Sequence, residues 1–165
     1  MARLVLVGLP GVGKSTVARM LSAEWNCQHV DTDDIIVKNA GCSIGDFIRE
    51  KGEPAFRELE FEALEEALKS EGVVATGGGI VTFEKSRAAL KDAPTVWLDT
   101  HDDQITPRLG GTDRPLLDGN PGQILKLMRE ARAPFYEEVS RARVDASGTL
   151  EDVKNQIRIV AGSWS

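Results

Sequence analysis

Short apolar runs alternate along the chain with longer segments in which apolar residues recur at helical spacing. Runs of branched and small apolar residues are consistent with buried strands of a parallel sheet, because such strands have no solvent-facing side. Five segments fit this pattern, with expected bounds at residues 3–7, 28–30, 73–76, 95–99 and 142–146. The clearest helix runs from Glu53 to Ser70, where one apolar stripe contains Phe56, Leu59, Ala63, Leu64, Ala67 and Leu68.

The remaining helices are expected at 16–25, 33–39, 44–51, 83–93, about 101–108, 124–140 and 150–160. Ser43 is expected to cap the helix at 44–51, Gly41 and Gly52 to end the helices before them, and Pro134 to kink its helix. Strands that alternate with helices predict a three-layer α/β/α sandwich around a five-stranded parallel sheet, in a single domain over residues 1–165. The order of the strands within the sheet stays open.

The composition is that of an ordinary globular protein, with 41% hydrophobic and 28% charged residues in a chain of 165. A net charge of −6 argues against a general surface for nucleic acids or anionic membranes, although it allows a local basic pocket. No segment has the apolar length of a membrane span or a signal sequence, so a cytoplasmic location is expected.

The cysteines and histidines indicate no metal site or disulfide. Cys27 and Cys42 are not arranged as a CxxC pair and are expected to be free, reduced thiols. His29 and His101 are isolated in the sequence and receive no role. A monomer is expected, because neither a heptad repeat nor a large apolar surface stripe is evident.

One motif carries specific chemistry, because "GLPGVGKS" from Gly8 to Ser15 fits GxxxxGK[ST] in full between an expected strand and an expected helix. Its glycines let backbone N–H groups turn toward phosphates, and the helix N-terminus adds partial positive charge. Lys14 can reach the β- and γ-phosphates, and the Ser15 hydroxyl can bind Mg²⁺. The predicted ATP site therefore contains Gly11, Val12, Gly13, Lys14, Ser15 and Thr16.

This phosphate-binding loop occurs in GTPases, ATPase motors and small-molecule kinases alike. The guanine-reading patterns NKxD and TKxD are absent from the chain, and motors are usually larger. An early acidic pair in "DTD" and an arginine within the glycine-rich segment 109–122 favour a phosphotransferase with a mobile lid.

Six motifs in order along nearly the whole chain give it a resemblance to the shikimate kinase family. They are "GLPGVGKST" at 8–16, "DTD" at 31–33, "GEPAFRELE" at 52–60, "TGGG" at 76–79, "RPLL" at 114–117 and "RAPFYEEV" at 132–139. The resemblance implies transfer of the ATP γ-phosphoryl group to the 3-hydroxyl of shikimate, which yields shikimate 3-phosphate and ADP on the route to chorismate and aromatic amino acids. It also implies a nucleoside monophosphate kinase-like fold, a substrate-binding region at about 32–61 and a lid at about 109–122.

The resemblance assigns Arg57 and Arg132 to the carboxylate of shikimate. Guanidinium groups suit this role because they form planar, bidentate hydrogen bonds to carboxylates. Glu60 lies one helical turn after Arg57 and is expected to hold it in place. Taken without the resemblance, either arginine could equally be an exposed helix residue.

Three acidic residues follow the second expected strand. By the resemblance, Asp33 accepts hydrogen bonds from the acceptor hydroxyls and is a candidate base for the attacking one, while Asp31 joins Ser15 in the Mg²⁺ shell. Either residue could instead cap the next helix, and Asp34 is expected to be a cap or a solvated charge.

The three consecutive glycines Gly77, Gly78 and Gly79 end the third expected strand. Bare backbone is costly in chain entropy, so something must approach it closely. The resemblance makes these glycines the floor of the acceptor pocket, where a Cβ would meet the substrate ring and the N–H of Gly78 would bond the substrate. A simple tight turn is the alternative, but it would need fewer glycines.

Two further arginines follow, Arg114 inside the glycine-rich segment 109–122 and Arg108 just before it. In the resembled family, Arg114 reaches the ATP phosphates from the lid and stabilises the transferred group, and Arg108 lies over adenine. The stretch 146–152 has no basic residue of the kind that family members often place near adenine, so the contact with adenine on that side stays open.

Two other functions are compatible with a phosphate-binding loop in a chain of this size. A gluconate-type kinase would also need a carboxylate site, but the three glycines with Arg57 and Arg132 favour shikimate. A regulatory nucleotide-binding protein without turnover is the second rival, and the presence of Lys14, Ser15, Asp33 and Arg114 argues against it.

Overall fold

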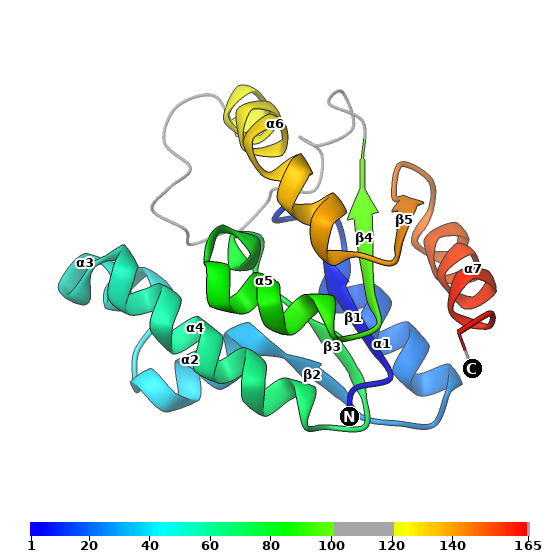
Figure 1. The fold of residues 1–165 in the computed structure, drawn as a ribbon, viewed down its shortest axis with the longest axis horizontal. Helices are drawn as coiled ribbons and strands as arrows, with labels where there is room; N and C mark the ends of the chain where they lie inside the picture. The colour runs from blue at the N-terminus through cyan, green and yellow to red at the C-terminus, as the bar shows by residue number, and fades with distance from the viewer. Residues whose placement is uncertain (101–120, 165) are drawn as a thin grey trace.

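A five-stranded parallel sheet forms the centre of the protein (Figure 1). The computed structural model describes residues 1–100 and 121–164. The strands are β1 (Leu4–Val7), β2 (His29–Asp31), β3 (Val73–Ala75), β4 (Thr95–Asp99) and β5 (Ala142–Asp145), and their order in the sheet is β2-β3-β1-β4-β5. All neighbouring strands run parallel, as the alternating pattern predicts.

The central strands are buried on both faces, which is why they consist of apolar residues without alternation. Every residue of β1 and β3 is buried, and in β1 the four side chains Leu4 to Val7 have no exposed surface. The register pairs Leu4 with Val73 and Val5 with Thr95. The carboxyl ends of β1, β2, β3 and β4 therefore meet at one edge, where open α/β sheets bind their ligands.

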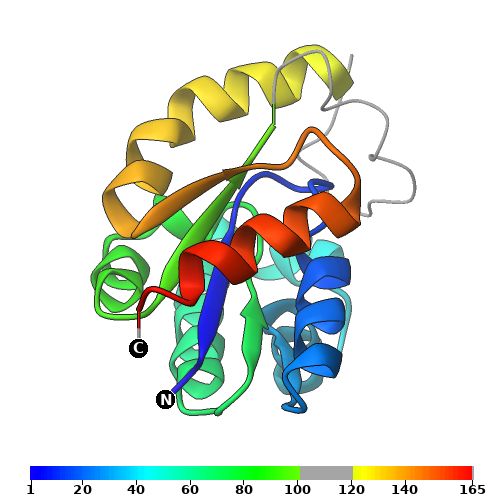
Figure 2. The ribbon, with the colours of Figure 1, turned by 90° about the vertical axis from the view of Figure 1, so that its right-hand side faces the viewer.

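Helices cover both faces of the sheet and make three layers (Figure 2). Helices α1 (Lys14–Glu24) and α7 (Leu150–Ala161) lie on one face, and α4 (Glu53–Leu68), α5 (Glu84–Lys91) and α6 (Pro121–Val139) lie on the other. A short 3₁₀ turn, η1 (Ile80–Thr82), joins β3 to α5. Within the described part of the chain, no helix is both long and apolar enough to cross a bilayer.

A small second core lies under helices α2 (Thr32–Ala40), α3 (Ile44–Lys51) and α4. Ile36, Phe56 and Ala63 are fully buried there. The side chain of Ser43 caps α3 by accepting from the N–H of Asp46 at 3.1 Å, as expected. These helices hold residues 32–61 as one packed unit beside the sheet (Figure 1).

Most expected elements are present with bounds shifted by one or two residues, and β4 agrees in full. The expected start of α6 was wrong. Helix α6 begins at Pro121 rather than at 124, because proline is favoured at the first helical position, so 121 and 122 do not belong to the loop expected at 109–122. The cap of α2 is Asp31, for which capping was one of the two roles weighed, and Asp34 is exposed as a solvated charge would be. The helix expected at 101–108 lies outside the described residues.

Candidate active site

The loop between β1 and α1 is shaped to receive an anion. Gly11 and Gly13 have φ angles of 81° and 102°, in the left-handed region where glycine is favoured. Gly13 is the N-cap of α1 and supplies no side-chain hydrogen bond, so the first N–H groups of the helix have no cap from a side chain. Such N–H groups and the helix dipole together favour phosphate.

Lys14 is held at the centre of this loop. Its ammonium donates hydrogen bonds of 2.7 Å to the carbonyl oxygens of both Gly8 and Leu9, and the residue is only 7% exposed. The loop backbone therefore wraps around the lysine and holds its positive charge among the same peptide units whose N–H groups face an anion.

Ser15, in the first turn of α1, and Asp31, at the end of β2, meet directly. The Ser15 hydroxyl donates to Oδ2 of Asp31 at 2.6 Å, while Oδ1 of Asp31 accepts from the backbone N–H of Asp33 at 2.9 Å. One carboxylate thus caps α2 and contacts the phosphate-binding loop. Both roles weighed for Asp31 are compatible, and Asp33 sits half-buried in the first turn of α2.

The glycine loop Gly77–Gly79 is buried and has its carbonyl groups fixed on the protein. The carbonyl oxygen of Gly77 accepts from the N–H of Ile80 at 3.2 Å, and that of Gly79 accepts from the N–H of Thr82 at 3.0 Å. In the described part of the chain, no acceptor receives a hydrogen bond from the N–H of Gly77, Gly78 or Gly79. Since buried backbone N–H groups are almost always bonded, three consecutive ones without an acceptor suit the oxygen atoms of a ligand.

The glycine loop contacts two other parts of the site. A Cβ added to Gly78 would lie 2.5 Å from Cδ of Pro10, and one added to Gly79 would lie 2.5 Å from Nη2 of Arg57. For Gly78 and Gly79 this corrects the reason expected, because protein atoms and not a substrate ring take the space that a Cβ would need. Pro10 of the phosphate-binding loop and the Arg57 guanidinium therefore lie directly beside Gly78 and Gly79.

Arg57 is a buried cation held by two carboxylates of its own helix. Its Nη1 donates to Glu60 at 2.7 Å, and its Nη2 donates to Glu53 at 3.0 Å. Arg57 is 5% exposed and Glu60 is fully buried, which confirms that Glu60 holds Arg57. The partner Glu53 was not foreseen, although its position four residues before Arg57 is a spacing that allows such a pair.

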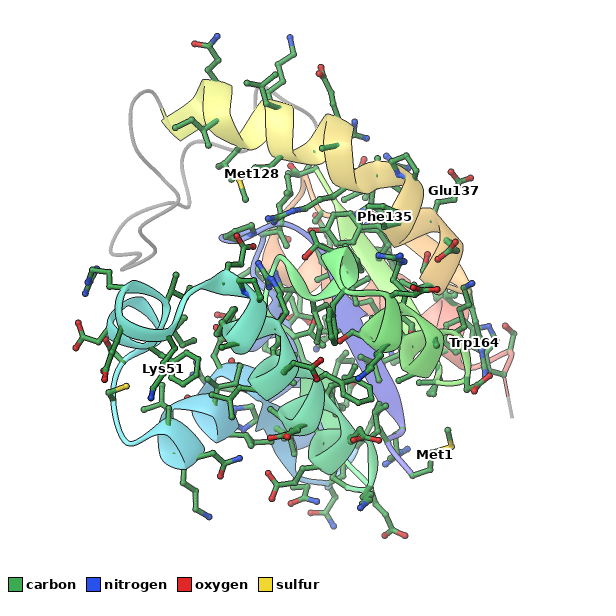
Figure 3. All side chains as sticks on the ribbon, turned by 60° about the vertical axis from the view of Figure 1, so that its left-hand side comes forward. Met1, Lys51, Met128, Phe135, Glu137 and Trp164 are labelled. Atoms are coloured by element: carbon green, nitrogen blue, oxygen red, sulfur yellow. The ribbon has the colours of Figure 1, made fainter. Side chains whose placement is uncertain are left out.

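Helix α6 brings Arg132 and Tyr136 toward the glycine loop. The Tyr136 hydroxyl donates to the carbonyl oxygen of Gly78 at 2.5 Å, and Arg132 lies one turn earlier on the same face of the helix. Nη1 of Arg132 is buried and has no hydrogen-bond partner among the described residues. Figure 3 shows Met128 and Phe135 pointing from α6 toward the fold and Glu137 pointing away from it.

An ion cluster at the end of β4 fixes α6 on the sheet. The buried Asp99 carboxylate accepts bonds of 2.7–2.8 Å from Arg129 of α6 and 2.7 Å from Arg143 of β5. Burial raises the pKa of the Asp99 carboxyl, but the hydrogen bonds and charges of Arg129 and Arg143 outweigh this and leave the pKa below its ordinary value of 3.8. The cluster therefore helps to fix the helix that carries Arg132 and Tyr136.

The arrangement as a whole can hold a nucleoside triphosphate next to a small anionic acceptor. It joins a phosphate loop, a hydroxyl–carboxylate pair, a floor of N–H donors and two arginines from separate elements. The expected residues Arg108 and Arg114 lie outside the described residues. Pro10 and Tyr136 were missed, although both stand inside motifs that had been recognised, because a sequence motif does not show which of its members touch each other.

Three comparisons with known proteins show the family of the chain. The family model described as shikimate kinase matches residues 10–161. A curated shikimate kinase of Corynebacterium efficiens is 43% identical over 143 residues, which cover 86% of this chain and 85% of the relative. One from Thermobifida fusca is 42% identical over 145 residues, covering 87% and 84%.

Solved structures show the same fold. A shikimate kinase from Acinetobacter baumannii, solved in complex with shikimate, has a TM-score of 0.90 and 31% identity, covering 97% of this chain and 93% of its own. A gluconokinase from Sinorhizobium meliloti has a TM-score of 0.64 at 18% identity, covering 98% and 91%, which shows only a shared fold. From its match over nearly the whole length to the family model and to curated relatives, the chain belongs to the shikimate kinase family.

Proposed function

We propose that the chain binds ATP on the loop Gly8–Ser15 and shikimate against the glycine loop, and that it transfers the γ-phosphoryl group to the 3-hydroxyl of shikimate. The observation that carries the proposal is the position of the glycine loop. Gly78 lies against Pro10 of the phosphate loop, and Gly79 lies against the Arg57 guanidinium. A phosphoryl donor and a carboxylate-bearing acceptor would therefore bind side by side.

Phosphoryl transfer depends mainly on positioning and on charge stabilisation. Lys14 and the N–H groups of the loop and of α1 bind the phosphates, together with Gly11, Val12, Gly13, Ser15 and Thr16. The Lys14 ammonium would neutralise charge on the β- and γ-phosphates as the bond to the leaving oxygen breaks. The same charge keeps the γ-phosphorus oriented toward the acceptor.

The acceptor would be held by its carboxylate and its hydroxyls. Arg57 and Arg132 bind the carboxylate, and the support for Arg132 is a buried Nη1 without a described partner. Asp33 accepts from the hydroxyl groups and takes the proton of the attacking one, a contribution that is modest in this class of reaction. The shikimate bound to the relative from Acinetobacter baumannii supports this choice of acceptor.

Mg²⁺ belongs to the proposal as the metal that accompanies ATP. The Ser15 hydroxyl and the Asp31 carboxylate, 2.6 Å apart, are oxygen ligands of the kind that Mg²⁺ prefers, and it commonly uses one or two protein ligands with waters and phosphates. The ion would add positive charge next to the phosphates. Arg108 and Arg114 complete the proposed ATP site, and their assignment rests on the family resemblance alone.

A monomeric state and a cytoplasmic location are also part of the proposal. The two cysteines, Cys27 and Cys42, are free thiols in the structure, which suits a reducing compartment.

An assay of ADP release with several acceptors tests the proposed reaction. Turnover should require Mg²⁺ and shikimate, while gluconate and nucleoside monophosphates should give little. Arg132→Ala should weaken shikimate binding by about 1.5–3 kcal/mol and leave the KM for ATP nearly unchanged. The matched control is Arg49→Ala, since that side chain is 56% exposed. Equal turnover with gluconate, or none with shikimate, would reject the proposal.

A further inference from the structure

Tyr136 is buried at the junction of α6, the sheet and the glycine loop. It is the only tyrosine in the chain and has no exposed surface. Its ring stacks on Trp97 of β4 with centroids 5.6 Å apart and an interplanar angle of 26°. Its hydroxyl donates to the Gly78 carbonyl at 2.5 Å, so the packing of the ring directs the hydroxyl toward that oxygen.

The carbonyl groups of the glycine loop differ in how they are held. The carbonyl oxygen of Gly79 accepts from the N–H of Thr82 at 3.0 Å and from the Thr82 hydroxyl at 2.7 Å. The carbonyl oxygen of Gly77 accepts from the N–H of Ile80. Among the described residues, Tyr136 is the one donor to the Gly78 carbonyl. The orientation of that peptide therefore depends on a side chain from another element, 58 residues away.

The orientation of one carbonyl determines that of an N–H. The peptide unit is planar and trans, so the Gly78 carbonyl and the Gly79 N–H point in opposite directions. A hydroxyl that holds the carbonyl toward α6 consequently holds the N–H away from it. Glycine has no Cβ to restrict rotation of this unit, so without the hydroxyl the peptide has more freedom than any other residue would allow.

We propose that Tyr136 is a positioning residue for phosphoryl transfer, which fixes the peptide between Gly78 and Gly79 so that the Gly79 N–H at the end of the glycine loop faces the acceptor. This inference rests on the proposed function of the loop as the acceptor floor. Tyr136 contacts the loop and not the reacting atoms, so it acts through the backbone. Its effect should therefore fall on the acceptor and on the chemical step rather than on ATP binding.

Tyr136→Phe is the variant that isolates the hydroxyl, because the ring and its stacking on Trp97 stay in place. Its matched control is Thr82→Val, which also removes a hydroxyl bonded to a carbonyl of the loop but leaves the N–H of Thr82 bonded to Gly79. We expect Tyr136→Phe to raise the KM for shikimate about fivefold and lower kcat about tenfold, since small misplacements of bound groups cost large factors in rate. Thr82→Val should change each constant less than about twofold.

A second measurement uses the protein without substrates. Hydrogen–deuterium exchange of peptides that contain Ile80 and Thr82 reports on the two amides that close the glycine loop. In Tyr136→Phe these amides should exchange at least about threefold faster, while amides of β1 and α7 keep their rates. Thr82→Val is the comparison for the local loss of a hydroxyl.

The two measurements separate the possible failures. If the wild type does not turn over shikimate but the loop of Tyr136→Phe exchanges faster, the proposed function fails and the control of the loop by Tyr136 stands. If shikimate is turned over and Tyr136→Phe has wild-type kinetics, the positioning role is overturned whatever the exchange shows. Equal loss of melting temperature in both variants, with parental kinetics in both, would mean that the hydroxyl only stabilises the fold.

Discussion

The Arg57 guanidinium donates a 2.7 Å hydrogen bond to Glu60 one turn later on α4, and both side chains are buried. A buried cation needs a paired carboxylate, because desolvation of an isolated charge costs several kcal/mol. Glu53, whose side chain is half exposed, accepts two further hydrogen bonds, from Nε and Nη2 of Arg57. The guanidinium is therefore fixed against Gly79 without the help of a ligand.

Glu60→Gln should therefore lower the free energy of unfolding by about 2–3 kcal/mol, because it removes the charge that compensates a buried arginine. The KM for shikimate should rise as Arg57 loses its fixed orientation, with the KM for ATP unchanged. Glu53→Gln is the control, since that side chain is 49% exposed and its pair should contribute less than about 1 kcal/mol. Urea denaturation and steady-state kinetics measure both effects. Equal effects in the two variants would show that burial of Glu60 does not matter.

The sequence predicted the fold class and most elements, because buried parallel strands and amphipathic helices leave clear patterns. The strand order was not predictable, since it depends on which strands meet in space and not on any one segment. The 3₁₀ turn Ile80–Thr82 was also missed, because its bonds to Gly77 and Gly79 arise from the shape of the glycine loop. The phosphate loop was recognisable from the sequence, since its motif lies within eight consecutive residues, but the proximity of its Pro10 to Gly78 was not.

The acceptor side of the site was predictable only through the resemblance. Arg57 and Arg132 look like ordinary helix arginines in the sequence, and their burial comes from tertiary packing. The role of Tyr136 depends on a bond to Gly78 across 58 residues, and the contact of Gly78 with Pro10 joins two motifs that are distant in sequence. Such pairs cannot be read from local spacing.

Lys14→Met should reduce turnover at least about a hundredfold, the loss seen when one group that stabilises transition-state charge is removed. Methionine has a similar length but cannot donate to the Gly8 and Leu9 carbonyls, so stability should fall by at most about 2 kcal/mol. ADP release and a melting curve measure the two effects. Lys38→Met, at an exposed position on α2, should behave like the wild type. Parental kcat in Lys14→Met would mean that ATP is used elsewhere.

Asp99→Asn should lower the free energy of unfolding at neutral pH by about 2–4 kcal/mol, because Arg129 and Arg143 would lose their carboxylate partner. The pKa of Asp99 is lowered in the folded state, so its contribution is complete above the ordinary value of 3.8 and is lost as the pH falls below it. The difference between wild type and variant should therefore be constant from pH 7 to about 5 and shrink below pH 3.8.

The control for this pH dependence is Asp46→Asn. The pKa of Asp46 is also lowered, through its hydrogen bond with Arg49, but the pair is exposed. Its removal should change the melting temperature little at any pH. Denaturant titrations from pH 3 to pH 7 compare the two variants. A difference between Asp99→Asn and wild type that does not narrow in acid would contradict the lowered pKa.

Gly78→Ala should weaken the binding of both ATP and shikimate, and not of shikimate alone. The added Cβ would lie 2.5 Å from Cδ and 2.9 Å from the backbone nitrogen of Pro10, so the phosphate loop has to shift. We expect a lower melting temperature and higher KM values for ATP and shikimate together, because the two loops share this contact. A rise confined to the KM for shikimate would show that the methyl meets the acceptor and not Pro10.

The double variant Pro10→Ala with Gly78→Ala tests the contact itself. Removal of the proline ring takes away the atoms at 2.5 and 2.9 Å, but the backbone nitrogen remains at 2.9 Å. The double variant should therefore recover part of the stability and ATP affinity lost in Gly78→Ala, with a coupling energy of about 0.5–3 kcal/mol for residues in contact. Pro10→Ala alone supplies the reference for the cycle. Additive losses in the two single variants would mean that the Gly78 methyl is accommodated without pressing on the phosphate loop, and that the two loops bind their substrates independently.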